Sequence, residues 1–155
     1  MKFAKPRRLS EGDTVAVLAP CGGAAHKFPW VYESGLKNLE KYFGLKIKEF
    51  PTARASPDFL YKNPKARADD INAAFADKNV KAIITTIGGD DSIRILPHLD
   101  TKIIKKNPKI FMSFSDGATM LIYFNQLGIV TFNGPHIMAG FSQMHNLPKS
   151  FETHV

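Results

Sequence analysis

The sequence predicts an α/β protein with an open, mostly parallel sheet of about five strands and helices on both faces. Residues 14–19 and 80–87 form apolar runs without polar alternation, which is typical of strands buried on both faces of a parallel sheet. Between such runs lie segments whose apolar residues recur at helical spacing. Strands that alternate with helices indicate a parallel sheet with right-handed crossovers.

The first half of the chain begins with a strand that a Gly-Asp turn introduces and a glycine-containing loop ends. Residues 45–50 alternate between apolar and polar, as a strand at or near a sheet edge does. Asn63 and Pro64 are a typical helix start. The elements expected in this half are a strand at 14–19, a loop at 20–23, a helix that Gly44 ends, a strand at 45–50, a loop at 51–62 and a helix from 63.

The second half continues the alternation and ends in a segment of weak periodicity. Its expected elements are a strand at 80–87, a turn at 88–91, a short helix ended by Pro97, a connection at 100–106, a strand at 110–112, a helix from Ala118 and a strand at 129–132. We therefore expect a flavodoxin- or Rossmann-like three-layer domain at 1–135, followed at 136–155 by a linker or the start of a further domain.

Composition narrows the class of protein. The chain has 155 residues and 44% hydrophobic content, which suits one folded domain. It shows no membrane span and no signal peptide, so a cytoplasmic location is the expectation. The formal charge of +7 is spread along the chain, without a nucleic-acid module, so we expect neither nucleic-acid nor membrane binding. With one cysteine and no metal-ligand spacing, no metal site and no cofactor are expected.

A serine stands where the strand at 110–112 turns into the next helix. Ser115 has a small residue two positions before it, Ser113, and Gly117 two positions after it, as in the G-x-S-x-G nucleophile elbow of serine hydrolases. Ser115 is therefore a candidate nucleophile. The alternative is an ordinary strand-to-helix turn in which Ser115 or Asp116 caps the helix.

A double glycine marks a second part of the same sheet edge. Gly88 and Gly89 follow a buried strand and precede a short helix, so their backbone N–H groups are available to a ligand. Ligands of open α/β sheets bind at the carboxyl ends of the strands. The sequence thus brings the double glycine and Ser115 to the edge where a binding site is expected.

Taken together, these motifs resemble the LD-carboxypeptidase family of serine peptidases, over nearly the whole chain. The version Gly-Gly-Asp-Asp-Ser-Ile-Arg is more similar to the microcin C immunity-type branch than to muropeptide LD-carboxypeptidases, which more often carry an aromatic residue and a glycine in place of Asp90 and Asp91. The segments that carry the resemblance are 6–9, 12–14, 19–20, 88–94, 96–97, 107–109, 114–116 and 132–135.

The resemblance implies a role for each matching residue. The family uses a Ser-Glu-His triad, in which Ser115 matches the nucleophile. The backbone N–H of Asp116 matches one oxyanion donor, and we choose the N–H of Gly89 as the second. The substrates implied are peptidyl-nucleotides or muropeptide-like amides. The residues expected to bind the substrate are Gly88, Asp90, Asp91, Arg94, Asn133, Gly134 and Pro135, with an ion pair to Asp90 or Asp91 as the alternative for Arg94.

The chain also departs from the family pattern. The triad glutamate and histidine lie in a C-terminal domain that this sequence lacks, so these 155 residues alone are expected to be inactive or nearly so. Ser113 replaces a usual glycine and Ala118 a usual threonine, and both changes argue against normal activity. A partner that supplies the missing domain, or a homodimer, is possible. A non-catalytic binding or dimerisation module, or nucleotide binding without hydrolysis, is the alternative function.

A local histidine is the other source of a catalytic base. His136 follows a strand end on the same sheet edge and is the best placed, although a solvated surface histidine is the more typical interpretation. The same surface interpretation applies to His26, His98, His145 and His154, the last with Glu152 nearby. Cys21 is an alternative nucleophile, but a small buried hydrophobic residue is the more typical interpretation.

Overall fold

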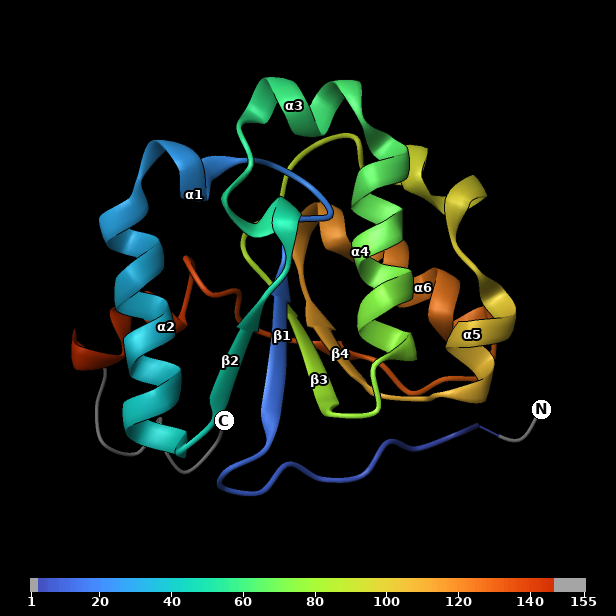
Figure 1. Cartoon of the computed structure of the whole chain (residues 1–155), viewed down its shortest axis with the longest axis horizontal. Helices are drawn as coiled ribbons and strands as arrows, with labels where there is room; N and C mark the ends of the chain where they lie inside the picture. Colours follow the sequence, from blue (N-terminus) through green and yellow to red (C-terminus); the bar gives the residue numbers. More distant parts are fainter. Residues whose placement is uncertain (1–2, 147–155) are drawn as a thin grey trace.

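A five-stranded sheet in the order β2-β1-β3-β4-β5 forms the centre of the computed structural model, which describes residues 3–146 (Figure 1). Every neighbouring pair of strands is parallel, so the predicted fold class is confirmed. The order is that of flavodoxin-like sheets, in which the connections reverse between β1 and β3. The strands are β1 (Thr14–Leu18), β2 (Lys46–Glu49), β3 (Val80–Thr85), β4 (Ile110–Ser113) and β5 (Phe132–Asn133).

Helices cover both faces of the sheet, which gives the expected three layers. In Figure 1, α2 lies on one side of the strands and α4, α5 and α6 on the other. The helices are α1 (Ala24–Lys27), α2 (Pro29–Phe43), α3 (Pro57–Lys62), α4 (Pro64–Ala76), α5 (Thr101–Lys106) and α6 (Ala118–Gln126), with 3₁₀ turns η1 (Pro51–Arg54), η2 (Ser92–His98), η3 (Ser115–Gly117) and η4 (Phe141–Asn146).

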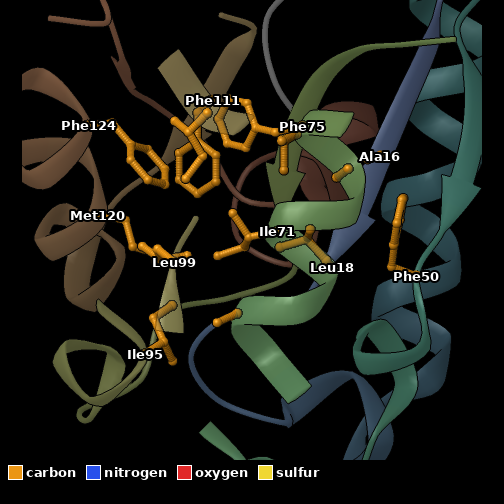
Figure 2. Packing of buried hydrophobic residues seen from close by; sticks show 14 of the residues in the cluster. Ala16, Leu18, Phe50, Ile71, Phe75, Ile95, Leu99, Phe111, Met120 and Phe124 are labelled. Carbon is orange, nitrogen blue, oxygen red and sulfur yellow. The ribbon is translucent and has the colours of Figure 1, made fainter. Parts of the chain in front are cut away.

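Three phenylalanines from different elements fill the core on the α4 side of the sheet (Figure 2). The Phe111 ring of β4 lies edge-to-face on Phe124 of α6, with centroids 4.9 Å apart. The Phe75 ring of α4 meets Phe124 in the same way at 5.4 Å. Because all three side chains are fully buried, this cluster fixes β4 against the two helices. The strand that leads into Ser115 therefore starts from a rigid base.

Two segments expected to be irregular are helical. The predicted loop at 51–62 contains η1 and α3, whose N-cap Ser56 accepts a hydrogen bond from the Phe59 N–H. The predicted connection at 100–106 contains α5, which Asp100 caps by accepting from the N–H groups of Lys102 and Ile103. Capping stabilises helices too short for a recognisable apolar stripe. The turn η2 also continues through Pro97, which was expected to end it.

The segment after β5 packs back onto the sheet. Gly35 of α2 lies so close to Ile137 that a Cβ at position 35 would stand 2.7 Å from Cγ2 of that isoleucine. The Asn38 side-chain amide donates to the Phe141 carbonyl over 2.7 Å. The folded unit therefore continues past the predicted boundary at 135, at least to Asn146. That a further domain follows stays a prediction, and residues 147–155 lie outside the described part.

Across residues 3–146, no helix combines the length and the apolar character that a bilayer crossing requires.

Candidate active site

Ser115 begins the turn η3 directly after β4, at the carboxyl edge of the sheet. Its φ of 58° makes it the one non-glycine residue with positive φ among residues 3–146. This left-handed conformation costs an L-residue about 1–2 kcal/mol. The side chain of Ser115 is exposed. An exposed serine with positive φ on a sharp strand-to-helix turn is the conformation that a nucleophile elbow requires, and we call residues 113–117 the elbow. That Ser115 is a nucleophile stays a prediction.

Small residues on both sides of Ser115 make the turn possible, as the sequence predicts. A Cβ at Gly117 would lie 2.8 Å from the Ser113 Cβ and would overlap its hydroxyl oxygen. That buried hydroxyl lies 2.8 Å from Thr85 Oγ1 and 3.2 Å from His136 Nε2. The Ser113 hydroxyl thus occupies the space that Gly117 leaves open and is held there by two polar neighbours.

His136 is fully buried, so the interpretation as a surface histidine is wrong. Its ring stacks on Phe114 with centroids 4.1 Å apart, and its Nε2 accepts a hydrogen bond from the Phe114 N–H over 3.1 Å. Burial lowers the pKa of His136 to about 4. The ring is therefore neutral near pH 7. Because its Nε2 accepts the Phe114 N–H, His136 holds the backbone directly before Ser115 in place.

Gly88 lies against Ser115, and Gly89 lies against Gly22 and Asp116. A Cβ at Gly88 would be 3.0 Å from both Cβ and Oγ of Ser115. A Cβ at Gly89 would be 2.8 Å from the Gly22 nitrogen and 3.2 Å from an Asp116 carboxylate oxygen. The Gly22 N–H donates to the Gly88 carbonyl over 2.9 Å. The Gly22 nitrogen therefore excludes a side chain at Gly89, whereas a side chain at Gly88 would force the Ser115 side chain to shift.

The two predicted oxyanion donors lie on the two segments that meet at Ser115. Within the described part of the chain, neither the Asp116 N–H nor the Gly89 N–H donates to a protein acceptor. Their role as a pair of oxyanion donors stays a prediction.

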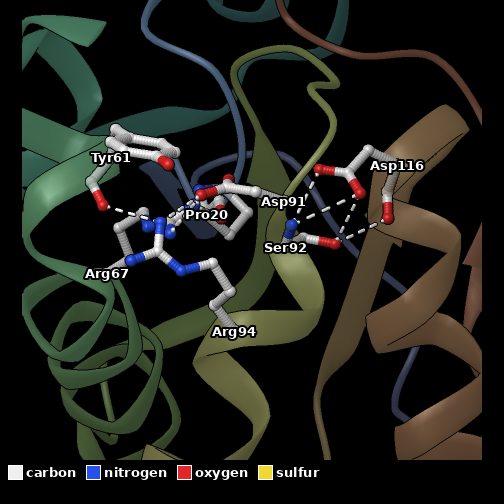
Figure 3. Close-up of polar contacts among 7 residues, drawn as sticks. All are labelled: Pro20, Tyr61, Arg67, Asp91, Ser92, Arg94 and Asp116. Carbon is white, nitrogen blue, oxygen red and sulfur yellow. Dashed lines mark hydrogen bonds and ion pairs between the residues drawn. The ribbon is translucent and has the colours of Figure 1, made fainter. Parts of the chain in front are cut away.

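The Asp116 carboxylate joins the elbow to the double-glycine turn (Figure 3). It accepts a hydrogen bond from the Ser92 N–H over 3.1 Å and lies 2.9 Å from the Ser92 hydroxyl oxygen. The same hydroxyl lies 2.8 Å from the Asp116 carbonyl oxygen. Ser92 directly follows the turn at 88–91, so the segment with the candidate nucleophile and the segment with the second candidate donor are hydrogen-bonded to each other.

Asp91 of the turn at 88–91 binds two arginines from neighbouring elements, Arg67 of α4 and Arg94 of η2. For Arg94, the ion pair that was the alternative to substrate binding is present. Its guanidinium donates to Asp91 over 2.9 Å and to the Tyr61 carbonyl over 2.8 Å. Burial raises the pKa of Asp91, but hydrogen bonds from Arg67 and Arg94 outweigh this effect and hold the pKa below its usual value. Asp90 is exposed at the tip of the turn. That Asp90, Asp91 or Arg94 contacts a substrate stays a prediction.

The sequence prediction missed Arg67, a fully buried arginine whose guanidinium binds Asp91. One signal could have found it. Arg67 stands four residues before Ile71 and eight before Phe75, which places it on the buried stripe of α4. An arginine on such a stripe requires a buried acceptor, since an unpaired charge in a core is strongly unfavourable.

The segment after β5 forms the other side of the elbow. Asn133 pairs with Ser113 in the parallel ladder, and the Gly134 N–H donates to the Ser113 carbonyl over 3.1 Å. Asn133 is exposed, whereas Gly134 and Pro135 are partly buried. These three residues lie at the same sheet edge as Ser115, and their contact with substrate stays a prediction.

The remaining candidates are placed less favourably. Cys21 is buried, and burial raises the pKa of its thiol, which keeps the thiol in its unreactive protonated form. His26, His98 and His145 are exposed, whereas His154 and Glu152 lie outside the described residues. Within residues 3–146, no three His, Cys, Asp or Glu side chains are grouped to bind a metal ion.

Replacement of Ser115 by glycine and by alanine tests the backbone strain at the elbow. Glycine adopts positive φ without a Cβ clash, whereas alanine retains the clash, and both variants lack the hydroxyl. We expect Ser115→Gly to be about 1 kcal/mol more stable than Ser115→Ala in urea unfolding. Equal stabilities would contradict the left-handed conformation.

Comparison with known proteins gives a consistent result. The sequence model of a protein family, described as the LD-carboxypeptidase N-terminal domain, matches residues 15–134 of this chain. The chain is 34% identical over 149 residues to a probable murein peptide carboxypeptidase of Bacillus subtilis, covering 94% of this chain and 46% of that protein. It is 46% identical over 130 residues to a putative carboxypeptidase of Treponema pallidum, covering 83% and 38%.

Solved structures are similar over the same region. An MccF-like protein from Streptococcus pneumoniae in complex with AMP has a TM-score of 0.80 at 27% identity, covering 92% of this chain and 43% of that one. The microcin C7 self-immunity protein MccF, known from Escherichia coli, in complex with aspartyl sulfamoyl adenosine has a TM-score of 0.87 at 26% identity, covering 96% and 44%. The chain spans less than half the length of the relatives it matches.

Proposed function

This chain belongs to the LD-carboxypeptidase family, whose N-terminal domain it contains, and on that premise we propose that Ser115 is the nucleophile of a serine carboxypeptidase or amidase. The observation that carries the proposal is the exposed Ser115 at φ 58°, in contact range of Gly88. A strained serine with open backbone donors beside it serves acyl transfer better than it serves helix capping.

The proposed reaction is amide hydrolysis through an acyl-enzyme. The Ser115 oxygen attacks the carbonyl carbon and gives its proton to a base, and the carbonyl oxygen becomes an oxyanion facing the N–H groups of Asp116 and Gly89. The C–N bond then breaks as the amine takes up a proton. Water hydrolyses the remaining ester and regenerates the serine.

The substrates of relatives suggest the class of amide. One relative is named for murein peptides, and the solved neighbours contain AMP or an aspartyl sulfamoyl adenosine. We therefore propose a small peptidyl-nucleotide or muropeptide-like substrate, whose scissile carbonyl lies above Ser115. The exposed Asn133 and Asp90 at the rim of the site are proposed to contact it.

The base is proposed to come from outside these 155 residues. His136 offers no lone pair to Ser115, because its accepting nitrogen already binds the Phe114 N–H. We propose that the family's glutamate and histidine, in a C-terminal domain, complete the triad. The 155 residues alone are therefore proposed to be inactive or nearly so, since loss of the base removes most of the rate.

A non-catalytic binding or dimerisation module is the second candidate. It is favoured by large apolar side chains that stay exposed on this domain, among them Phe28, Trp30 and Ile93. Under this alternative Ser115 would react no faster than any other exposed serine. The reactivity of the hydroxyl therefore separates the two candidates.

Labelling with a fluorophosphonate tests the nucleophile. The probe forms a covalent bond to an activated serine oxygen and releases fluoride, and peptide mapping by mass spectrometry locates the adduct. We expect Ser115 to react at least ten-fold faster than Ser10, an exposed serine in a loop, because the oxyanion donors accelerate attack even without the base. Ser115→Ala should abolish the fast adduct. Equal rates at Ser115 and Ser10 would refute the proposal.

A turnover assay tests the inactivity of the isolated chain. Hydrolysis of a muropeptide and of a peptidyl-adenylate analogue is measured beside the Bacillus subtilis relative as positive control. We expect the chain to be at least about a thousand-fold slower, as expected for an enzyme without its base. Comparable turnover would show that the base lies within these 155 residues.

A further inference from the structure

A buried arginine ties the double-glycine turn to the helical layer (Figure 3). The Arg67 guanidinium of α4 donates through Nη1 to Asp91 Oδ1 over 2.7 Å and through Nη2 to Oδ2 over 3.1 Å. Its Nη1 also donates to the Pro20 carbonyl over 3.1 Å. One side chain therefore connects α4, the loop after β1 and the turn after β3.

The burial of this pair is not explained by stability alone. Arg67 is 0% exposed, whereas the Asp91 side chain is 18% exposed. Buried ion pairs contribute little or nothing to stability compared with apolar residues of similar size. The Arg67 Nε–H also has no acceptor among the described residues, which adds the cost of an unsatisfied donor. A specific placement of the Asp91 carboxylate is the evident gain.

Hydrogen bonds fix both ends of the short turn at 88–91. Asp91 and Ser92 are adjacent, so Arg67 holds one end of the turn to α4 while the Ser92–Asp116 hydrogen bonds hold it to the elbow. The Gly22 N–H on the Gly88 carbonyl fixes the start of the turn. Gly89 lies between these three attachments and has no side chain that could fix it by packing.

We propose that Arg67 is a positioning residue that acts through Asp91 to hold the Gly89 N–H beside Ser115. This inference rests on the proposed function for its chemical consequence, while the placement of Gly89 is measurable independently. Arg7 provides a control, because its guanidinium binds both carboxylate oxygens of Asp13 over 2.7 Å from a side chain that is 57% exposed. This ion pair stands before β1, at the opposite end of the parallel strands from Ser115, so a change in it should have little effect on the turn at 88–91.

The test compares Arg67→Lys with Arg7→Lys in the full chain. Lysine keeps the charge but lacks the fork that binds both carboxylate oxygens. Two readouts are measured under conditions in which circular dichroism shows each variant folded: the amide resonance of Gly89 in an ¹H–¹⁵N spectrum, and the fluorophosphonate labelling rate of Ser115 relative to Ser10. We expect Arg67→Lys to shift the Gly89 amide and to slow Ser115 labelling about ten-fold, whereas Arg7→Lys leaves the Gly89 amide in place and changes labelling less than two-fold.

A second variant covers the case in which Arg67→Lys does not fold. Asp91→Asn keeps the shape of the side chain and removes its charge, and it should shift the Gly89 amide in the same way. An unmoved Gly89 amide in a folded Arg67 or Asp91 variant overturns the positioning role, whatever the labelling rates. If the amide moves but wild-type Ser115 never labels faster than Ser10, the positioning role stands and the proposed nucleophile fails.

Discussion

Replacement of Gly117 by alanine is expected to lower the free energy of unfolding by about 3 kcal/mol, an overpacking cost at the upper end of the usual range. The added Cβ would lie 2.8 Å from the Ser113 Cβ and would overlap the Ser113 hydroxyl. That hydroxyl has nowhere to move without losing contact with Thr85 or His136, both buried beside it. Urea unfolding of Gly117→Ala against the wild type measures the loss.

A double variant identifies the clash as the cause. Ser113→Gly removes both Ser113 atoms that the new Cβ meets. Ser113→Gly alone should cost about 1 kcal/mol, because it removes a buried hydroxyl and weakens a strand. Combined with Gly117→Ala, it should recover at least about 1 kcal/mol of the loss, as contacting residues do in double-mutant cycles. Additive losses would show that the cost arises elsewhere in the turn.

The fold was predictable because burial on both faces leaves a direct trace in the sequence. The apolar residues of β1 and β3 are buried almost without exception, so their runs show no polar alternation. The edge strand β2 was equally visible from its alternation, and its charged residues are exposed. In these strands, one physical cause determines both the amino-acid pattern and the position in the sheet.

The helices α3 and α5 were missed because their stability does not come from an apolar stripe. Each has six residues, too few to show a helical period. They begin at the caps Ser56 and Asp100, residue types that are equally common in loops. A cap preceding a short polar segment therefore cannot be distinguished from a turn without its three-dimensional partners.

The candidate site also has one part that was predictable from the sequence and another part that was not. The position of Ser115, with small residues two before and two after it, follows from local backbone geometry and was predictable from spacing. The roles of Arg67 and His136 follow from contacts to Asp91 and Phe114, residues 24 and 22 positions away. Such contacts depend on how α4 and the segment after β5 pack on the sheet, which no local pattern specifies.

The free energy of unfolding is expected to fall by about 3 kcal/mol as the pH decreases from 6.5 to 4, with His136 as the cause. Burial holds the pKa of His136 at about 4, against its ordinary value of 6.5. In this window the unfolded chain binds a proton at this residue and the folded chain does not, so acid favours unfolding. Each pH unit contributes up to about 1.4 kcal/mol.

The variant His136→Gln isolates this contribution. Its amide oxygen can accept the Phe114 N–H in place of Nε2 and does not titrate, so the difference in stability between the wild type and this variant should change with pH only between 6.5 and 4. Carboxylates such as Asp91 act on both proteins and cancel in the difference. If urea unfolding gives the same pH slope for His136→Gln and for the wild type, burial does not keep His136 neutral. The role of His136 as a neutral acceptor that holds the Phe114 backbone would then have to be abandoned.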